Sequence, residues 1–177
     1  MTALPVLVAL GGADCERIGS GWLDQPANAT SSLAFVAVGG LLLVRSAAPG
    51  AHRVSLGSAG AALSGVGLAS VAYHGPQPAW AGPVHDGTIV GLAVVMAGHG
   101  VWWLARRLGR GREAARGGRW WAAAGACGTA GVAAYVVGRT GGMLCHPGSL
   151  WQPHAAWHIL VAAALGCAVV AAGEDVF

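Results

Sequence analysis

Apolar residues dominate five stretches of the chain, and polar and glycine-rich segments separate these stretches from one another. A helix needs about 20 residues to cross the hydrocarbon core of a bilayer, and the stretches approach that length. The pattern therefore predicts an all-α, polytopic membrane helix bundle with five transmembrane helices in a single domain, residues 1–177. The predicted spans cover residues 29–44, 54–74, 84–105, 120–138 and 154–172, and residues 1–28 precede them.

The composition of the chain supports a membrane protein. Of the 177 residues, 55% are hydrophobic and only 10% are charged, whereas about 25% of the residues of an ordinary soluble domain are charged. The net charge of +3 comes from arginine, because the chain contains no lysine. We interpret this charge as a determinant of membrane topology and expect no nucleic-acid partner.

The distribution of arginine predicts the orientation of the bundle. Eight of the ten arginines lie beside the loops that follow the first and third predicted spans: Arg45, Arg53, Arg106, Arg107, Arg110, Arg112, Arg116 and Arg119. The positive-inside rule then places the N-terminus outside and the C-terminus inside. Heavy use of alanine, glycine and arginine is typical of GC-rich bacterial genomes, so we expect a bacterial plasma membrane.

Tryptophans gather at membrane interfaces, and they fit this orientation. The same topology brings several polar residues to one membrane face. His74 closes the second predicted span, Asp86 opens the third, and His154 and His158 open the fifth. All four are expected at the extracytoplasmic ends of their helices, where ionisable residues are usually functional.

The spacing of these residues predicts a metal site. His154 and His158 are four residues apart and project from one side of a helix, and Ser70 and His74 repeat that spacing. Three histidines with an open fourth position are typical of catalytic zinc. Taken singly, each feature has another explanation. An HxxxH pair also occurs by chance or as haem ligands. Ser70 can donate a hydrogen bond to a carbonyl of its own helix, and Asp86 can cap the start of the third span.

The remaining four histidines are expected at membrane interfaces: His52, His85, His99 and His146. His85 neighbours Asp86 and could instead support the site, although adjacent side chains on a helix point about 100° apart.

At these positions the chain resembles the alkaline ceramidase family, within the CREST superfamily of membrane hydrolases. The shared pattern is a serine four residues before a histidine, an aspartate at the start of the next helix, and a late HxxxH. Here it reads Ser70-Val71-Ala72-Tyr73-His74, Asp86 and His154-Ala155-Ala156-Trp157-His158, and the N-terminal Cys15-Glu16 and Asn28-to-Phe35 segments and Cys145-His146 are also similar. The better-known members have seven spans.

The resemblance implies a zinc ion held by His74, His154 and His158, and hydrolysis of a ceramide-like or other N-acyl lipid of the membrane at its amide bond. Asp86 would accept a proton from water and pass it to the leaving amine. Ser70 would donate a hydrogen bond to the developing oxyanion or orient Asp86. Two alternatives remain open: a non-catalytic metal-containing receptor or accessory protein of the same superfamily, and a haem-binding membrane subunit.

Two further features follow from the resemblance. Some relatives bind calcium through an N-terminal acidic cluster, and the corresponding residues here are Asp14, Glu16, Asp24 and Gln25, with Gln25 where a glutamate is expected. Calcium prefers six to eight oxygen ligands, so this substitution weakens the case. Cys15 and Cys145 fall on the predicted outer, oxidising face, which together with the resemblance suggests a disulfide.

Overall fold

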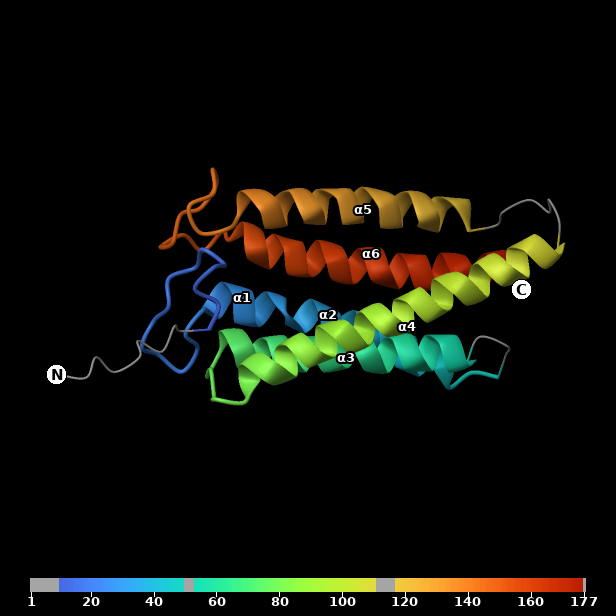
Figure 1. The fold of residues 1–177 in the computed structure, drawn as a ribbon, viewed down its shortest axis with the longest axis horizontal. Helices are drawn as coiled ribbons and strands as arrows, with labels where there is room; N and C mark the ends of the chain where they lie inside the picture. The colour runs from blue at the N-terminus through green and yellow to red at the C-terminus, as the bar shows by residue number, and fades with distance from the viewer. Residues whose placement is uncertain (1–9, 50–52, 111–116, 177) are drawn as a thin grey trace.

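The computed structural model describes residues 10–49, 53–110 and 117–176. These residues form six α-helices and no strand (Figure 1). The helices are α1 (Pro26–Ser31), α2 (Leu33–Ser46), α3 (Arg53–His74), α4 (Ala81–Arg110), α5 (Gly118–Val137) and α6 (Pro153–Val176). Within the described ranges, five helical segments are long and apolar enough to cross a membrane, because α1 and α2 together form one span, Pro26–Ser46. The predicted fold class is confirmed.

The first span begins three residues before the predicted start at residue 29, and its start depends on a distant residue. Pro26 occupies the first turn of α1, where a missing N–H costs no hydrogen bond. The next two backbone N–H groups, those of Ala27 and Asn28, donate to the two carboxylate oxygens of Glu16 at 2.7 and 2.8 Å. Glu16 thus satisfies donors that a helix start otherwise leaves without partners.

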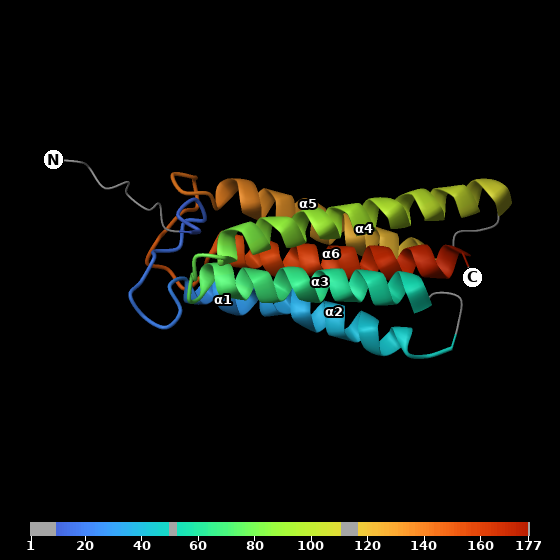
Figure 2. The same ribbon diagram turned by 60° about the horizontal axis from the view of Figure 1, so that its bottom comes forward.

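The last helix, α6, lies at the centre of the bundle. It contacts every other helix, and α2 packs along α3 while α4 lies across α3 (Figure 2). Within the described residues, the backbones of α4 and α5 do not approach one another. The buried apolar core comes mainly from α2, α3 and α6, and its largest members are Phe35, Leu42, Leu63, Val66, Leu92 and Val169.

The two helices on the periphery, α4 and α5, turn apolar side chains outward. Val94 and Val101 of α4 are 67% and 70% exposed, and Val132 of α5 is 59% exposed. In water such surfaces would be unfavourable, whereas in a bilayer they face lipid. The fold is therefore that of an integral membrane protein.

The bundle has two chemically different ends. We call the end where α3 finishes at His74 and α6 begins at Pro153 the histidine end, and the end where α4 finishes and α5 begins the arginine end. They lie at opposite ends of the long axis of the molecule (Figure 1). The polar residues expected to share one membrane face do lie at one end; which side of the membrane that end faces stays a prediction.

Two loop segments cover the histidine end, one before α1 and one between α5 and α6 (Figure 1). A disulfide joins them through Cys15 and Cys145, as the sequence suggested. Two backbone hydrogen bonds reinforce the link, from Arg17 N to the carbonyl of Pro147 and from Thr140 N to the carbonyl of Ala13. The N-terminal segment is thereby held against the entrance to α6.

Candidate metal centre

Three buried histidines meet at the histidine end. His74 is the last residue of α3, and His154 and His158 lie in the first two turns of α6. One ring nitrogen from each lies within 4.8 Å of the others, and the side chains are only 1–5% exposed. The predicted convergence of these three residues is confirmed, and the cluster could hold a metal ion.

His74 is held from behind by Gln25. The Nδ1 of His74 lies 2.7 Å from the Oε1 of Gln25, and the Nε2 of Gln25 donates to the carbonyl oxygens of Gly11 and Glu16. Because both amide donors face carbonyls, the amide oxygen must face the histidine, so Nδ1–H of His74 donates. Gly11 adopts φ +72°, and a Cβ there would collide with the Gln25 side chain.

His158 is held in a similar way by a serine of the first span. Its Nδ1 lies 2.9 Å from the Oγ of Ser31, whose hydroxyl hydrogen is already directed to the carbonyl of Asn28. The serine oxygen therefore accepts, and Nδ1–H of His158 donates. In His158, as in His74, the proton sits on Nδ1 and the lone pair on Nε2.

These two Nε2 atoms are the best test of whether a metal fits. Both are buried, and neither has a hydrogen-bond partner among the described residues. Buried acceptors without partners are costly unless something else engages them. Neutral imidazoles whose other nitrogen donates to a fixed partner are the usual arrangement of histidine metal ligands, so the donor set fits an ion that prefers nitrogen, such as zinc.

The third histidine lies beside a carboxylate. The Nδ1 of His154 is 3.5 Å from the Oδ1 of Asp14, which also pairs with Arg139 at 2.9 Å. Arg139 in turn bonds and stacks on Tyr135. Burial raises the pKa of Asp14, and the charge of Arg139 opposes that shift. Asp14 thus links Arg139 and Tyr135 to the histidine cluster.

A cavity of about 460 Å³ adjoins the cluster and is walled by α3, α4, α5 and α6. Asp86 lines it with a side chain that is 80% exposed, and its Oδ1 is 3.1 Å from the Nδ1 of His85. Asp86 lies one turn inside α4, because that helix begins at Ala81 rather than near the predicted residue 84. Ser70, by contrast, is 2% exposed and is not one of the cavity-lining residues.

Three of the four residues considered for calcium make other side-chain contacts. Both carboxylate oxygens of Glu16 accept from the start of α1, Asp14 pairs with Arg139, and Gln25 supports His74. In the described part of the chain, the histidine trio is the single group of three or more histidine, cysteine or acidic side chains close enough to share an ion. The acidic residues Asp14, Glu16 and Asp24 do not form such a group, so the predicted calcium site gains no support from the structure.

One further histidine lines the cavity. For His85 the sequence left two positions open, an interface or a place beside Asp86 in the site; it stacks on Tyr73 with ring centroids 4.2 Å apart and lines the cavity. Its position next to Asp86 was the available signal. His99 was also expected at an interface; instead it bonds to Ser58 between α4 and α3. His52 lies outside the described residues, and His146 is exposed.

Compared with known proteins, the chain matches no protein-family model, no curated protein and no solved structure. The resemblance to alkaline ceramidases therefore rests on the motifs described above.

Proposed function

We propose that this protein is a zinc-dependent membrane amidase of the alkaline ceramidase type, which hydrolyses the amide bond of a ceramide-like or other N-acyl lipid. The observation that carries the proposal is the convergence of three buried imidazoles, two of which present an unpartnered Nε2. Their compact arrangement, with ring centroids 4.6–5.3 Å apart, suits an ion better than a porphyrin, which would need open space between two rings.

Zinc bound at this cluster would polarise the amide carbonyl and make water a better nucleophile at neutral pH. In this proposal Asp86 transfers the proton. Its carboxylate lines the cavity beside the cluster, and among the described residues it is engaged through Oδ1 alone, by His85. A group so placed can accept a proton from water and deliver it to the leaving amine.

The cavity wall supports a lipid as the substrate. Ile89, Tyr135 and Trp157 contribute apolar and aromatic surface next to the histidines, and the cavity lies between helices that span the membrane. An acyl chain can occupy such a wall while the amide lies near the cluster. Ser70 is placed one helical turn behind His74, and its proposed hydrogen bond to the reacting groups is tested by Ser70→Ala.

Elemental analysis of the purified protein tests the metal, with wild type beside His154→Ala and the matched control His146→Ala. We expect about one zinc per chain in wild type and in the control, and none in His154→Ala. A folded wild-type protein without zinc would overturn the proposal.

A screen of lipid amides then tests the reaction by following release of free fatty acid. Turnover that needs both zinc and Asp86 supports the amidase. Zinc without turnover on any N-acyl lipid would favour a metal-containing receptor or accessory protein of the same superfamily.

A further inference from the structure

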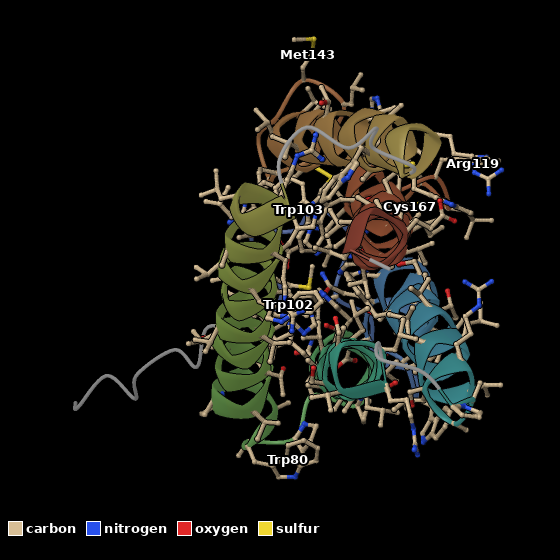
Figure 3. All side chains as sticks on the ribbon, turned by 90° about the vertical axis from the view of Figure 1, so that its right-hand side faces the viewer. Trp80, Trp102, Trp103, Arg119, Met143 and Cys167 are labelled. Carbon is tan, nitrogen blue, oxygen red and sulfur yellow. A yellow bond between two sulfur atoms is a disulfide. The ribbon has the colours of Figure 1, made fainter. Side chains whose placement is uncertain are left out.

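One arginine of the cavity wall takes no part in the proposed chemistry. Arg139 lies just beyond the end of α5, and it lines the cavity together with Asp14 and Tyr135. Met143, further along the same loop, points away from the bundle and is 84% exposed (Figure 3). The inward position of Arg139 is therefore set by its own contacts and not by the general course of the loop.

Two hydrogen bonds hold the guanidinium of Arg139, and both use the same nitrogen. Its Nη1 donates to the Oδ1 of Asp14 at 2.9 Å and to the hydroxyl oxygen of Tyr135 at 3.1 Å. The guanidinium also lies over the Tyr135 ring, 5.0 Å from its centroid. A guanidinium has N–H donors on all three nitrogens, so these contacts orient the group and leave the donors of Nε and Nη2 for other partners.

The unused edge of the guanidinium is accessible. In the described part of the chain, neither Nε nor Nη2 of Arg139 makes a hydrogen bond, and neither is a buried atom. The side chain as a whole is 39% exposed. Nε–H and one N–H of Nη2 point in parallel, which is the arrangement that binds both oxygens of a carboxylate at once. Arg139 thus offers a two-donor edge that suits a planar anion.

This edge lies close to the place where the amide would react. The Oδ1 of Asp14 contacts Arg139 at 2.9 Å and is 3.5 Å from the Nδ1 of His154, so one oxygen separates the guanidinium from the histidine cluster. The apolar part of the wall lies deeper, since Ile89 is about two turns inside α4 and Trp157 about one turn inside α6. An acyl chain along those two residues leaves the amine half of the substrate towards Arg139.

We propose that Arg139 selects the substrate by binding a carboxylate on its amine half, so that N-acyl amino acids are preferred among the N-acyl lipids. This inference rests on the proposed amidase function and names its substrate class. A carboxylate on the carbon next to the amide nitrogen lies about 2.5 Å from that nitrogen, a short spacing that matches a guanidinium so near the cluster. A neutral head group would leave the two-donor edge to water.

The charges of the cavity wall admit an anion. Asp14 is neutralised by Arg139, and Asp86 is the one other carboxylate among the described residues that line the cavity. A divalent ion at the histidines more than offsets the charge of Asp86. The potential in the cavity then favours a negatively charged head group over a positive one.

Paired substrates that differ in charge test the proposal. N-oleoylglycine carries the carboxylate, and N-oleoylglycinamide is its neutral isostere. Both are offered to the zinc-containing protein in phosphatidylcholine nanodiscs, whose lipids carry no net charge. Arg139→Gln removes the charge and the two-donor edge, whereas Arg139→Lys keeps a charge that can pair with Asp14 but lacks the edge. The control is Arg17→Gln, because Arg17 is an exposed arginine of the same end that does not line the cavity.

We expect the wild type to prefer the glycine conjugate by about 10–100-fold in kcat/KM, the range of a hydrogen-bonded charge. The preference should disappear in Arg139→Gln, mainly through a higher KM, decrease in Arg139→Lys and persist in Arg17→Gln. An arginine with a purely structural role would affect both conjugates equally, so an equal loss on both in the two Arg139 variants would overturn the proposal. Hydrolysis of both conjugates by wild type without preference would also overturn it and leave the amidase standing.

Equilibrium binding of tritiated N-oleoylglycine separates this inference from the proposed function. Binding that weakens in Arg139→Gln, in a protein that hydrolyses neither conjugate, would support the carboxylate site and overturn the amidase. Absence of both binding and hydrolysis would overturn both proposals.

Discussion

The two ends of the bundle use polar side chains in opposite ways. At the histidine end, buried polar groups are tied to one another: Gln25 to His74, Ser31 to His158, and Asp14 to Arg139. At the arginine end, the charges lie on the surface and rest on aromatic rings, with Arg106 over Trp102 and Arg119 over Trp120.

The two ends differ in how firmly their side chains are held in place. A disulfide and a set of interlocking hydrogen bonds fix the geometry of the histidine end, which a metal site needs if its ligands are to be preorganised. The arginine end is held by exposed pairs of modest strength, and α4 and α5 meet there through Trp103 and Trp121. Substitutions at the first end should therefore have specific and large effects, and those at the second end small ones.

The largest effect is expected at the mouth of the cavity beside the histidine cluster. Asp86→Asn keeps the shape of the side chain but removes its ability to accept a proton. Hydrolysis of the lipid amide should fall by about 10²–10⁴-fold, the range typical of general acid–base groups. Zinc content should be unchanged, since Asp86 is not one of the clustered ligands. Undiminished turnover would contradict the assignment of Asp86.

Opening the disulfide should have the next largest effect. Cys15→Ser removes a crosslink between residues 130 positions apart, which we expect to destabilise the protein by about 2–4 kcal/mol in thermal unfolding. The matched control is Cys127→Ser, since Cys127 is a free thiol in α5. Thiol titration of unfolded wild type should find two free thiols without reductant and four with it; an equal count in both would exclude the crosslink.

Replacing the amide nitrogen of Gln25 by an oxygen should weaken the metal site. Gln25→Glu keeps an oxygen that can accept from His74 but replaces the amide donor by a carboxylate oxygen that faces two carbonyl oxygens. Repulsion between these oxygens should move the side chain away from its position behind His74. Zinc affinity should fall by about 10–100-fold, as is usual when the partner of a ligating histidine is altered.

Gln152→Glu is the control for Gln25→Glu. Gln152 is also buried at the histidine end and donates to two carbonyls, but none of its described hydrogen bonds goes to the three clustered histidines. Competition with a chelator measures both variants. An equal loss in the two would mean that a buried carboxylate disturbs this end generally.

The smallest effect is expected at the arginine end. Glu174→Gln removes a pair with Arg119 that spans 3.7 Å between side chains 77% and 35% exposed, and it keeps an oxygen for the Nε1–H of Trp120. The unfolding free energy should change by less than about 1 kcal/mol, with no change in zinc content. A loss comparable to that of Cys15→Ser would remove the contrast between the two ends.

Local patterns were sufficient to predict the spans and the histidine cluster. The apolar runs predicted the number of membrane-spanning segments, and the spacing of His154 and His158 on one helix placed both imidazoles on one side. The end of α3 at His74 then brought the third histidine to the same level. These features follow from helix periodicity and from the alternating direction of successive spans, and both can be inferred from local stretches of the sequence.

The remaining features depend on contacts between distant segments. Pro26 is a local signal for the start of the first helix, but the contact of Glu16 with that start is not revealed by any property of residues 26–31. The bond between Gln25 and His74 and the stacking of His85 on Tyr73 arise only after α1, α3 and α4 have packed. Ser70 illustrates the converse: its spacing from His74 is right for a site, but the residue is buried and is not one of those that line the cavity.

The distribution of the three histidines along the chain also sets when the centre can be assembled during biosynthesis. His74 and its support from Gln25 are made early, but His154 and His158 belong to the final helix, and the disulfide partner Cys145 only just precedes it. Nascent chains halted before that helix inserts therefore lack two of the three ligands. In the proposed enzyme, metal loading therefore requires α6, and a cell could distinguish chains that contain this helix from chains truncated before it by whether they retain the ion.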